Sequence, residues 1–310
     1  MKSFRTIERR IEKEIMNTDI LVRIASDEAS KEEMIQSVEK AFQLMRQFAQ
    51  RYSRFIKGNE LWRFNQSAGG PVSQELLDLL QRATAHHQET DGKFDPSVLP
   101  SLEHEGYTGA YSDGLDHATS VPFSSLVLDP IARRATKPLE LKIDFGGFGK
   151  GYIVDRVTEF LSRTHPHVLV DAGGDIATRG GDVGRGESHW IIGVENPAQI
   201  DGPELCLLSL SGEAVATSGT NRRKWRSNEG AKHHLIDPET RRSSESTFLS
   251  VTVIAPSAET ADVLAKTLFL LGEGTAQQYA TDRELPAIFC SVNGNFEINH
   301  FAQPYVYSLV

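Results

Sequence analysis

The sequence predicts an α+β fold in which mixed sheets are flanked by helices. Short runs of β-forming residues alternate with helical stretches without a strict strand–helix–strand repeat, which favours α+β over a doubly wound parallel sheet. The 310 residues show no internal repeat, no heptad pattern and no long linker, so we expect a single domain over residues 1–310. Apolar residues recur at helical spacing at residues 34–48, 73–88, 151–163 and 258–271.

The composition indicates a globular chain with a sizeable core. Hydrophobic residues make up 39% and charged residues 24% of the sequence, a balance unlike that of disordered or fibrous proteins. The formal net charge of −9 has the wrong sign for a protein that follows a nucleic-acid backbone, so we expect no nucleic-acid partner. Cys206 and Cys290 stand in apolar runs far apart in the sequence, which predicts buried thiols rather than a disulfide.

In the N-terminal half, helical and β-type patterns are followed by an irregular segment. From residue 90 to residue 114, glycine, proline and aspartate are frequent, and Pro96 and Pro100 interrupt regular hydrogen bonding. Irregular segments of this kind often hold site residues. The elements expected before it are a strand at 19–25, a helix at 34–48, a loop-rich stretch at 53–70 and a helix at 73–88.

In the C-terminal half, short apolar runs predict most of the strands. The first of them, at 139–143, precedes a helix at 151–163, and the last, at 287–291, follows a helix at 258–271. The strands expected between these two helices lie at 168–171, 190–194, 205–210, 214–217 and 250–254.

The sequence also predicts a cytoplasmic protein without a membrane anchor. Residues 1–10 contain closely spaced charges and no apolar stretch of the kind found in signal peptides. The longest apolar run elsewhere, within 264–271, is interrupted by Lys266 and is far too short to span a bilayer.

A glycine-rich run at 144–151 places Lys150 between a predicted strand and a predicted helix. Unpaired N–H groups and the dipole at the start of a helix attract phosphate. The spacing of the glycines matches neither the P-loop nor the dinucleotide-binding fingerprint. The run therefore indicates either a locally held phosphate group or a tight turn with a solvated lysine.

Two further runs end strands in residues that suit a ligand. Residues 168–175 end in two glycines flanked by Asp171 and Asp175, where the backbone can approach a flat ligand or simply form a β-turn. Residues 214–225 lead from a strand to hydroxyls, a glycine and successive cations. That pattern suits a pyrophosphate or an acidic partner, and it is equally typical of a solvated basic loop.

Titratable side chains stand close together at two other places. His233 and His234 offer imidazoles that can act as a base near neutral pH, although most histidines are surface groups. Without a third ligand at suitable spacing, they are weak support for a metal site. Asp262 and Lys266 lie one helical turn apart, a spacing that is usual for an exposed ion pair.

The order of these runs resembles that of the ApbE family of FAD:protein FMN transferases, over roughly residues 14–292. The motifs behind the resemblance are Ser-Arg-Phe at 53–55, Asn-Glu-Leu-Trp-Arg-Phe-Asn at 59–65, Thr-Asp-Gly-Lys-Phe-Asp-Pro at 90–96, Asp-Phe-Gly-Gly-Phe-Gly-Lys-Gly at 144–151, Asp-Ala-Gly-Gly-Asp at 171–175, Ala-Thr-Ser-Gly at 216–219, His-Leu-Ile-Asp-Pro at 234–238, and Val-Thr-Val-Ile-Ala-Pro-Ser at 251–257 with Ala-Asp at 261–262.

The resemblance implies a T-fold-like α+β architecture that binds FAD, with Mg²⁺ at the pyrophosphate. A threonine hydroxyl of an acceptor flavoprotein attacks the phosphoanhydride, so that FMN is attached through a phosphodiester bond and AMP is released. Such chemistry depends on charge neutralisation and positioning more than on covalent catalysis, and glycines, cations and a metal ion suit it.

The resemblance also implies roles for particular residues. Lys150 is expected at the pyrophosphate, His234 as the base for the acceptor hydroxyl, and Asp262 as a catalytic Mg²⁺ ligand together with the Gly147 carbonyl. The FAD-contacting positions are Met16, Phe55, Lys93, Phe94, Asp95, Asp144, Lys150, Leu235 and Ile236.

This chain departs from the family pattern at several of these positions. Lys266 stands where many members have threonine, and an ammonium group cannot ligate Mg²⁺, which weakens the metal prediction. One hypothesis is that the Lys266 ammonium supplies part of the missing positive charge. Arg241 replaces a usual glycine and Asn221 a usual aromatic residue, so acceptor choice is expected to differ, and Phe55 replaces a more usual tyrosine.

Two other functions are compatible with the same residues. An FAD pyrophosphatase would use water in place of threonine and yield free FMN and AMP. A non-catalytic FAD-binding protein would have lost turnover together with its metal ligand. AMP production separates either enzyme from a binder, and flavin that stays on an acceptor after denaturation separates transfer from hydrolysis.

Overall fold

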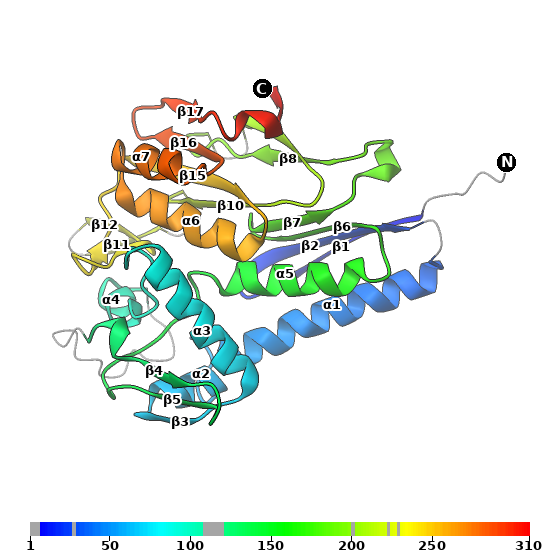
Figure 1. Cartoon of the computed structure of the whole chain (residues 1–310). Helices are drawn as coiled ribbons and strands as arrows, with labels where there is room; N and C mark the ends of the chain where they lie inside the picture. Colours follow the sequence, from blue (N-terminus) through cyan, green and yellow to red (C-terminus); the bar gives the residue numbers. More distant parts are fainter. Residues whose placement is uncertain (1–6, 27–28, 108–120, 200–201, 222–223, 228–229) are drawn as a thin grey trace. The chain divides into compact units, whose positions relative to one another are not determined.

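The computed structural model describes residues 7–26, 29–107, 121–199, 202–221, 224–227 and 230–310. The chain forms two compact units that alternate along the sequence (Figure 1). The expectation of a single domain stays a prediction, and each unit is described here by itself. Unit 1 comprises Met1–Gln47, Phe148–Asn221 and Thr247–Val310, and unit 2 comprises Phe48–Gly147 and Arg222–Ser246.

Both units combine helices with antiparallel strands, which confirms the α+β class. Unit 1 contains an eight-stranded sheet in which every neighbouring pair is antiparallel. Its strands, in spatial order, are β1 (Ile7–Ile15), β2 (Thr18–Ser26), β6 (His167–Ala172), β7 (Ile176–Arg179), β10 (Ala214–Gly219), β15 (Phe248–Ala255), β16 (Ala287–Ser291) and β17 (Phe296–Ile298).

The eight-stranded sheet is covered on both faces. Helix α5 (Gly149–Ser162) packs on β6 and β7, and α6 (Ala258–Leu271) packs on β10 and β15 (Figure 1). The opposite face buries alternate residues of the same strands against a three-stranded sheet in the order β18 (Val306–Leu309), β9 (Cys206–Leu210), β8 (Trp190–Val194). Because successive side chains of a strand point to opposite faces, one set packs against the helices and the other against the three-stranded sheet.

The starts of α5 and α6 lie in close contact. A Cβ atom at Gly151 would lie 2.5 Å from the Ala258 carbonyl oxygen, so only glycine fits. The Asp155 carboxylate accepts hydrogen bonds from the N–H groups of Ala258 (2.7 Å) and Glu259 (2.9 Å) and so caps α6. Burial raises the pKa of Asp155 to about 6, although these hydrogen bonds act in the opposite direction.

Helix α1 (Lys31–Tyr52) begins in unit 1 and ends in unit 2. It starts with a capping box, because the Ser30 N–H donates to Glu33 (2.8 Å) and the Glu33 N–H donates to the Ser30 hydroxyl (3.3 Å). Its buried stripe faces the β1–β2 hairpin, where Lys13 lies 4.8 Å above the Phe42 ring and pairs with Glu39 at 2.7 Å. The other elements of unit 1 are α7 (Thr275–Asp282) and short 3-10 turns at Val183–Arg185 and Gln303–Tyr305.

Unit 2 is built from short elements around α3 (Gln74–Glu89). A three-stranded sheet has the order β3 (Gly69–Pro71), β5 (Arg134–Thr136), β4 (Val127–Asp129). The two hairpins are β11 (Lys224–Ser227) with β12 (Gly230–His233), and β13 (Ile236–Asp237) with β14 (Arg242–Ser243). The remaining elements are α2 (Glu60–Asn65), α4 (Leu99–His104) and a 3-10 turn at Phe123–Ser125.

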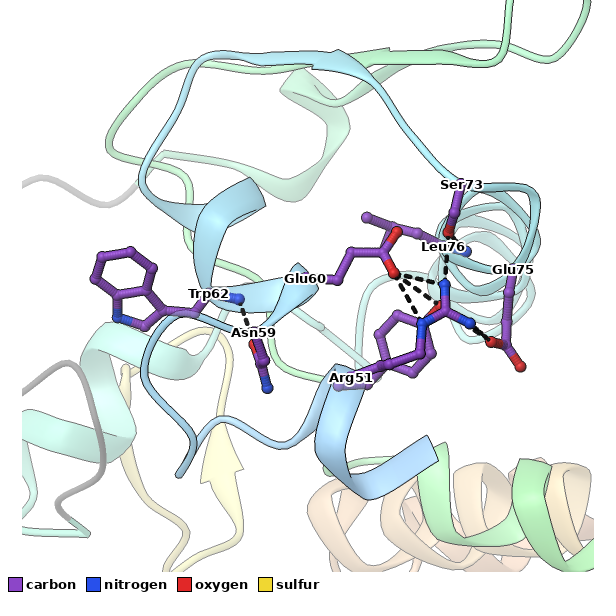
Figure 2. A network of polar contacts seen from close by, with 8 residues as sticks. Arg51, Asn59, Glu60, Trp62, Ser73, Glu75 and Leu76 are labelled. Carbon is purple, nitrogen blue, oxygen red and sulfur yellow. Dashed lines mark hydrogen bonds and ion pairs between the residues drawn. The ribbon is translucent and has the colours of Figure 1, made fainter. Parts of the chain in front are cut away.

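Arg51 joins three helices of unit 2. Figure 2 shows its guanidinium between Glu60 of α2, at 2.5 Å, and Glu75 of α3, with the Ser73 hydroxyl at 3.0 Å. Burial opposes the charge on Glu60, but hydrogen bonds from Ser73 and Arg51 outweigh it and keep the Glu60 pKa below its usual value. This network fixes the two ends of the loop at residues 53–59, because α1 ends before the loop and α2 begins after it.

The structure corrects several expected elements. Residues 139–143 form no strand, because both backbone groups of Ile143 bond to the Asn65 side chain (2.9 and 2.7 Å) instead of a neighbouring strand. The loop-rich stretch at 53–70 contains α2, and the irregular segment at 90–114 contains α4, although residues 108–114 lie outside the described residues. The strand at 287–291 is not the last element, because β17 and β18 follow it.

Other expectations are confirmed. The helix at 258–271 and the strands at 190–194 and 287–291 have the predicted bounds. Cys206 and Cys290 are free and buried, and burial raises the pKa of the Cys206 thiol to about 11. Within the described ranges, we find no helix whose length and apolar character would let it cross a membrane.

Candidate active site

The predicted site residues fall in both units. The charged residues in unit 1 are Lys150, Asp262 and Lys266, and Met16 also belongs to this unit. The residues in unit 2 are Phe55, Lys93, Phe94, Asp95, Asp144, Gly147, His234, Leu235 and Ile236.

Phe94 lies beneath the glycine-rich turn of unit 2. Its ring is buried, and a Cβ atom at Gly147 would come within 2.7 Å of it. The Phe94 N–H donates to the Thr90 hydroxyl (3.0 Å), and its carbonyl lies 2.9 Å from Nδ1 of His87. Phe94 therefore fixes the turn at Gly147, and glycine is required there for a close approach.

Ion pairs join the segment at 93–97 to the β13–β14 hairpin. Lys93 contacts Glu239 at 2.6 Å, and Asp95 contacts Arg241 at 3.1 Å. Asp95 also accepts hydrogen bonds from the Ser97 hydroxyl (2.6 Å) and the Ser97 N–H (2.8 Å). The two predicted FAD-contacting charges of this segment, Lys93 and Asp95, are therefore paired with residues of the loop between β13 and β14.

Arg241 adopts a backbone conformation that favours glycine. Its φ is 58°, and its N–H closes the turn by donating to the Asp237 carbonyl at 2.8 Å. A left-handed conformation costs a side-chain-bearing residue roughly 1–2 kcal/mol. Arg241 therefore has a strained backbone, and its guanidinium forms an ion pair with the buried carboxylate of Asp95.

The adjacent histidines have different surroundings. Nε2 of His233 lies 2.8 Å from the Ser244 carbonyl, and its Nδ1 accepts a hydrogen bond from the Leu235 N–H at 3.3 Å. Both contacts are satisfied by one neutral tautomer, with the proton on Nε2. Burial lowers the pKa of His233 below its usual value. His233 is therefore a structural residue, and His234, half-buried between β12 and β13, is the histidine left for a chemical role.

The other predicted residues of the hairpin and the turn are largely buried. Leu235 and Ile236 are 3% and 4% exposed, and the Leu235 carbonyl accepts the Ser244 N–H at 2.9 Å. Asp144 is 9% exposed, and its N–H donates to the Pro96 carbonyl at 2.9 Å. The Asp144–Pro96 hydrogen bond joins the glycine-rich turn to the segment at 90–97.

Phe55 belongs to an aromatic group that the motifs did not indicate. Its ring is 49% exposed and meets Tyr107 edge-on at 5.8 Å, while Tyr107 stacks on Trp225 at 5.3 Å. The Arg54 guanidinium lies 4.7 Å from the Phe55 ring and 4.5 Å from the Tyr107 ring. Trp225 is anchored through its indole N–H, which donates to the Glu105 carbonyl at 2.6 Å. Phe55 is thus an exposed ring on a rigid support.

In unit 1, Lys150 stands in the first turn of α5 and forms an ion pair with Asp175. Asp175 ends the turn between β6 and β7, in which Gly173 and Gly174 have φ values of 68° and 97°. Helix α5 begins after Phe148, whose side chain contains no acceptor that could cap it. The first N–H groups of α5 and the Lys150 ammonium therefore lie on the same turn of helix.

Met16 occupies the turn of the β1–β2 hairpin. Met16 and Asn17 have φ values of 59° and 56°, as in a type I′ turn, a conformation that is unusual for methionine. This turn is close to the one that holds Asp175, because a Cβ atom at Gly173 would come within 2.1 Å of the Thr18 hydroxyl. Met16 and Lys150 thus both flank the turn at 173–175.

Asp262 and Lys266 form an ion pair on α6. The Lys266 ammonium bonds to Oδ1 of Asp262, whose side chain is 2% exposed, while Oδ2 is buried without a hydrogen-bond partner. The orphaned oxygen suits a cation, but the ammonium already neutralises the carboxylate. Among the residues that the structure describes, no three His, Cys, Asp or Glu side chains gather around a common point. As they stand, these residues do not fit a Mg²⁺ site.

The sequence did not predict several of the residues that contact the candidate site residues. Asp175 was noted only as part of a turn, and Arg241 only as a departure from a glycine. Tyr107 lies next to the undescribed segment 108–120 and Trp225 follows a run of cations, of which Arg222 and Arg223 lie outside the described residues. Their partners are distant in sequence, so no local pattern could have paired them.

Known proteins resemble this chain over most of its length. The sequence model of the ApbE family matches residues 16–289. The FAD:protein FMN transferase of Salmonella typhimurium is 28% identical over 252 residues, which are 76% of this chain and 71% of that protein. The FAD:protein FMN transferase of Klebsiella pneumoniae is 27% identical over 302 residues, which are 90% of this chain and 88% of that protein.

Solved structures share the fold. The ApbE protein of Thermotoga maritima superimposes with a TM-score of 0.85 at 24% identity, over 96% of this chain and 99% of that one. The flavin transferase ApbE of Vibrio cholerae gives 0.82 at 24% identity, over 97% and 100% of the two chains. The match of the family model to residues 16–289 covers most of the 310 residues. The chain therefore belongs to the ApbE family.

Proposed function

We propose that this chain is an FAD:protein FMN transferase, which attaches FMN from FAD to a threonine hydroxyl of an acceptor flavoprotein and releases AMP. The observation behind the proposal is membership of the ApbE family over residues 16–289, with FAD:protein FMN transferases among the similar proteins. In this reaction the threonine oxygen forms a bond to the phosphorus of the FMN moiety. The bond from that phosphorus to the bridging oxygen breaks, and AMP leaves with the oxygen.

Lys150 is the proposed partner of the FAD pyrophosphate. Lys150 lies in the first turn of α5, where the N-cap residue Phe148 has no side-chain acceptor for the N–H groups. A cation and the start of a helix both favour the negative charge that the phosphates bring. Charge neutralisation of this kind is the main requirement of phosphoryl transfer.

His234 is the proposed base for the acceptor hydroxyl. It would accept the proton of the threonine as the oxygen attacks. The hydrogen bonds of His233 to Ser244 and Leu235 support this choice, because they leave His233 no lone pair for the acceptor.

The remaining predicted residues are proposed to contact FAD. Phe55 is the exposed ring suited to stack on a flat ligand, and Lys93 and Asp95 offer charges on the rigid segment beside the hairpin. The other proposed contacts are Met16, Phe94, Asp144, Leu235 and Ile236.

Mg²⁺ stays a prediction from the resemblance, with Asp262 and the Gly147 carbonyl as its ligands. The ion pair of Asp262 with Lys266 favours the alternative that the Lys266 ammonium supplies part of the positive charge in this chain. Mg²⁺, where it binds, neutralises phosphate charge. Activity in EDTA separates the two possibilities.

The deciding assay measures AMP released from FAD together with flavin bound to an acceptor after denaturation. The acceptor is a flavoprotein that holds FMN on a threonine, and its Thr→Val version is the control. We expect AMP and protein-bound flavin in equal amounts. AMP without bound flavin would indicate an FAD pyrophosphatase, and FAD binding without AMP, even with acceptor, would indicate a binding protein.

Two matched variants test the base. His234→Asn should bind FAD and lose transfer by at least about a hundredfold, a usual contribution of a general base. His233→Asn should mainly lower stability. Loss of transfer in His233→Asn but not in His234→Asn would contradict the assignment. The cytoplasmic location expected from the sequence also stays a prediction, for cell fractionation to test.

A further inference from the structure

One partner of the Lys150–Asp175 ion pair is almost fully buried. The side chain of Asp175 is 3% exposed and that of Lys150 is 17% exposed. A buried carboxylate is costly unless a cation stays beside it. The Lys150 ammonium is therefore drawn to one position before any ligand is present.

The backbone around Asp175 gives the carboxylate little freedom. The Asp175 carbonyl accepts the Ala172 N–H at 2.9 Å, and the Gly174 N–H donates to the Asp171 carboxylate at 2.8 Å. Gly173 packs so closely against the Thr18 hydroxyl that a Cβ atom would not fit. The turn thus presents Asp175 from a rigid support.

The Lys150 backbone is fixed as well. Gly151, the next residue, packs directly on the Ala258 backbone, so α5 lies against the start of α6 at this point. The lysine is therefore held at its Cα atom by helix packing and at its ammonium by Asp175. A free lysine side chain loses rotamer entropy when it binds a ligand, and this arrangement removes part of that loss in advance.

We propose that Asp175 is a positioning residue for Lys150: it holds the ammonium in place before FAD binds and shares it with the FAD pyrophosphate afterwards. The proposal rests on the proposed function, in which Lys150 meets the pyrophosphate. Sharing has two consequences of opposite sign. The carboxylate competes with the phosphates for the ammonium, which weakens ground-state binding, and it keeps the ammonium where the reaction needs it, which raises kcat.

Asp175→Asn tests both consequences, because it removes the charge and keeps the shape. ADP is the probe for the pyrophosphate, with its affinity measured by calorimetry. We expect ADP to bind this variant about threefold to tenfold more tightly, since the competing charge is gone. We expect kcat for AMP release from FAD to fall about tenfold or more, since the ammonium is no longer held. A merely structural ion pair would not move affinity and kcat in opposite directions.

The dependence on Lys150 is tested in a Lys150→Met background, where Asp175→Asn should leave ADP affinity unchanged. Glu159→Gln is the matched control, because it removes one carboxylate from α5 at a pair with Arg163 that is 3.0 Å long and about two-thirds exposed. It should alter neither ADP affinity nor kcat. Asp175→Glu retains the charge and displaces it, so it should keep the wild-type ADP affinity and recover only part of kcat.

Unchanged ADP affinity in Asp175→Asn, or the same change with and without Lys150, would overturn the proposal. Thermal unfolding checks that each variant is folded. If Asp175→Asn does not fold, Asp175→Glu decides through its unchanged ADP affinity and lowered kcat. If the wild-type chain neither releases AMP nor transfers FMN, the proposed function fails, and the ADP measurements still decide the role of Asp175.

Discussion

Lys266→Thr should convert the Asp262 carboxylate into a Mg²⁺ ligand. In the wild-type chain the Lys266 ammonium neutralises Asp262, which is 2% exposed and has one oxygen without a hydrogen-bond partner. Threonine removes the cation and adds a hydroxyl oxygen, a ligand that Mg²⁺ accepts. The variant therefore has an uncompensated buried charge unless a cation replaces the ammonium.

The structure sets the size of the effect. Breaking a buried ion pair by removing one partner costs about 3–5 kcal/mol, so Lys266→Thr should be clearly less stable than wild type in EDTA. A cation present at a hundredfold excess over its Kd restores about 2.7 kcal/mol. For a chain of 310 residues, that corresponds to a rise of roughly 4 °C in the unfolding midpoint.

The assay is thermal unfolding in EDTA and in a titration of MgCl₂. We expect Lys266→Thr to be stabilised by Mg²⁺ in a saturable manner, with Ca²⁺ less effective, and the wild type to respond by less than about 1 °C. The control is Lys266→Thr combined with Asp262→Asn, which should not respond. Equal stabilisation of wild type and Lys266→Thr by Mg²⁺ would refute the reasoning, because it would show that the ammonium does not replace the metal.

Three further changes test the packing and the charges. Arg241→Gly should lower the free energy of unfolding in urea by about 2 kcal/mol, because the buried Asp95 carboxylate loses its cation and relief of the left-handed backbone offsets only part of that cost; an unchanged free energy would contradict this. Gly151→Ala should lower stability by about 2 kcal/mol or more, because its Cβ atom would clash with the Ala258 carbonyl oxygen, and an unchanged unfolding midpoint would show that the helices can separate. His165 is 1% exposed, and burial lowers its pKa below the usual 6.5. The unfolded chain therefore binds a proton at this histidine more readily than the folded chain, so the free energy of unfolding falls as the pH drops below about 6.5. His165→Leu should flatten this pH dependence between about pH 5 and pH 7, and an unaltered slope would exclude His165 as its source.

Local patterns predicted the elements whose boundaries have local causes. Helix α6 was predicted with its bounds, because Ser257 caps its start through the Thr260 N–H at 3.2 Å and Gly272 ends it with a φ of 73°. Strands β8 and β16 were predicted as well, since both are continuous apolar runs. In these cases the sequence contains the start and stop signals themselves.

Elements that depend on distant partners were missed. In β1, Ile11 and Ile15 stand four residues apart, as in a helix, while Lys13 occupies the strand position between them. The structure explains the lysine, because its ammonium lies over the Phe42 ring of α1 and pairs with Glu39. No pattern within residues 7–15 contains that information.

The candidate site shows the same division. The motifs predicted which residues are chemically special, but not how their charges are compensated: Lys150 pairs with a residue 25 positions away, and Asp95 pairs with Arg241 from a distant hairpin. The φ of 58° at Arg241 could not be predicted, because arginine is not a residue that favours it.

The ion pairs of the predicted charged residues also determine how variants must be interpreted. Lys93, Asp95, Lys150 and Asp262 each have an oppositely charged partner in the structure. Removing one member of a buried pair leaves the charge of its partner uncompensated. The free-energy cost of that buried charge is then included in the measured effect of the substitution. An inactive Asp262→Ala chain would therefore not by itself identify a metal ligand, because Lys266 would lose its counter-charge in the same step. Double substitutions that remove both partners, compared with each single one, separate the contribution to FAD chemistry from the cost of an unpaired charge.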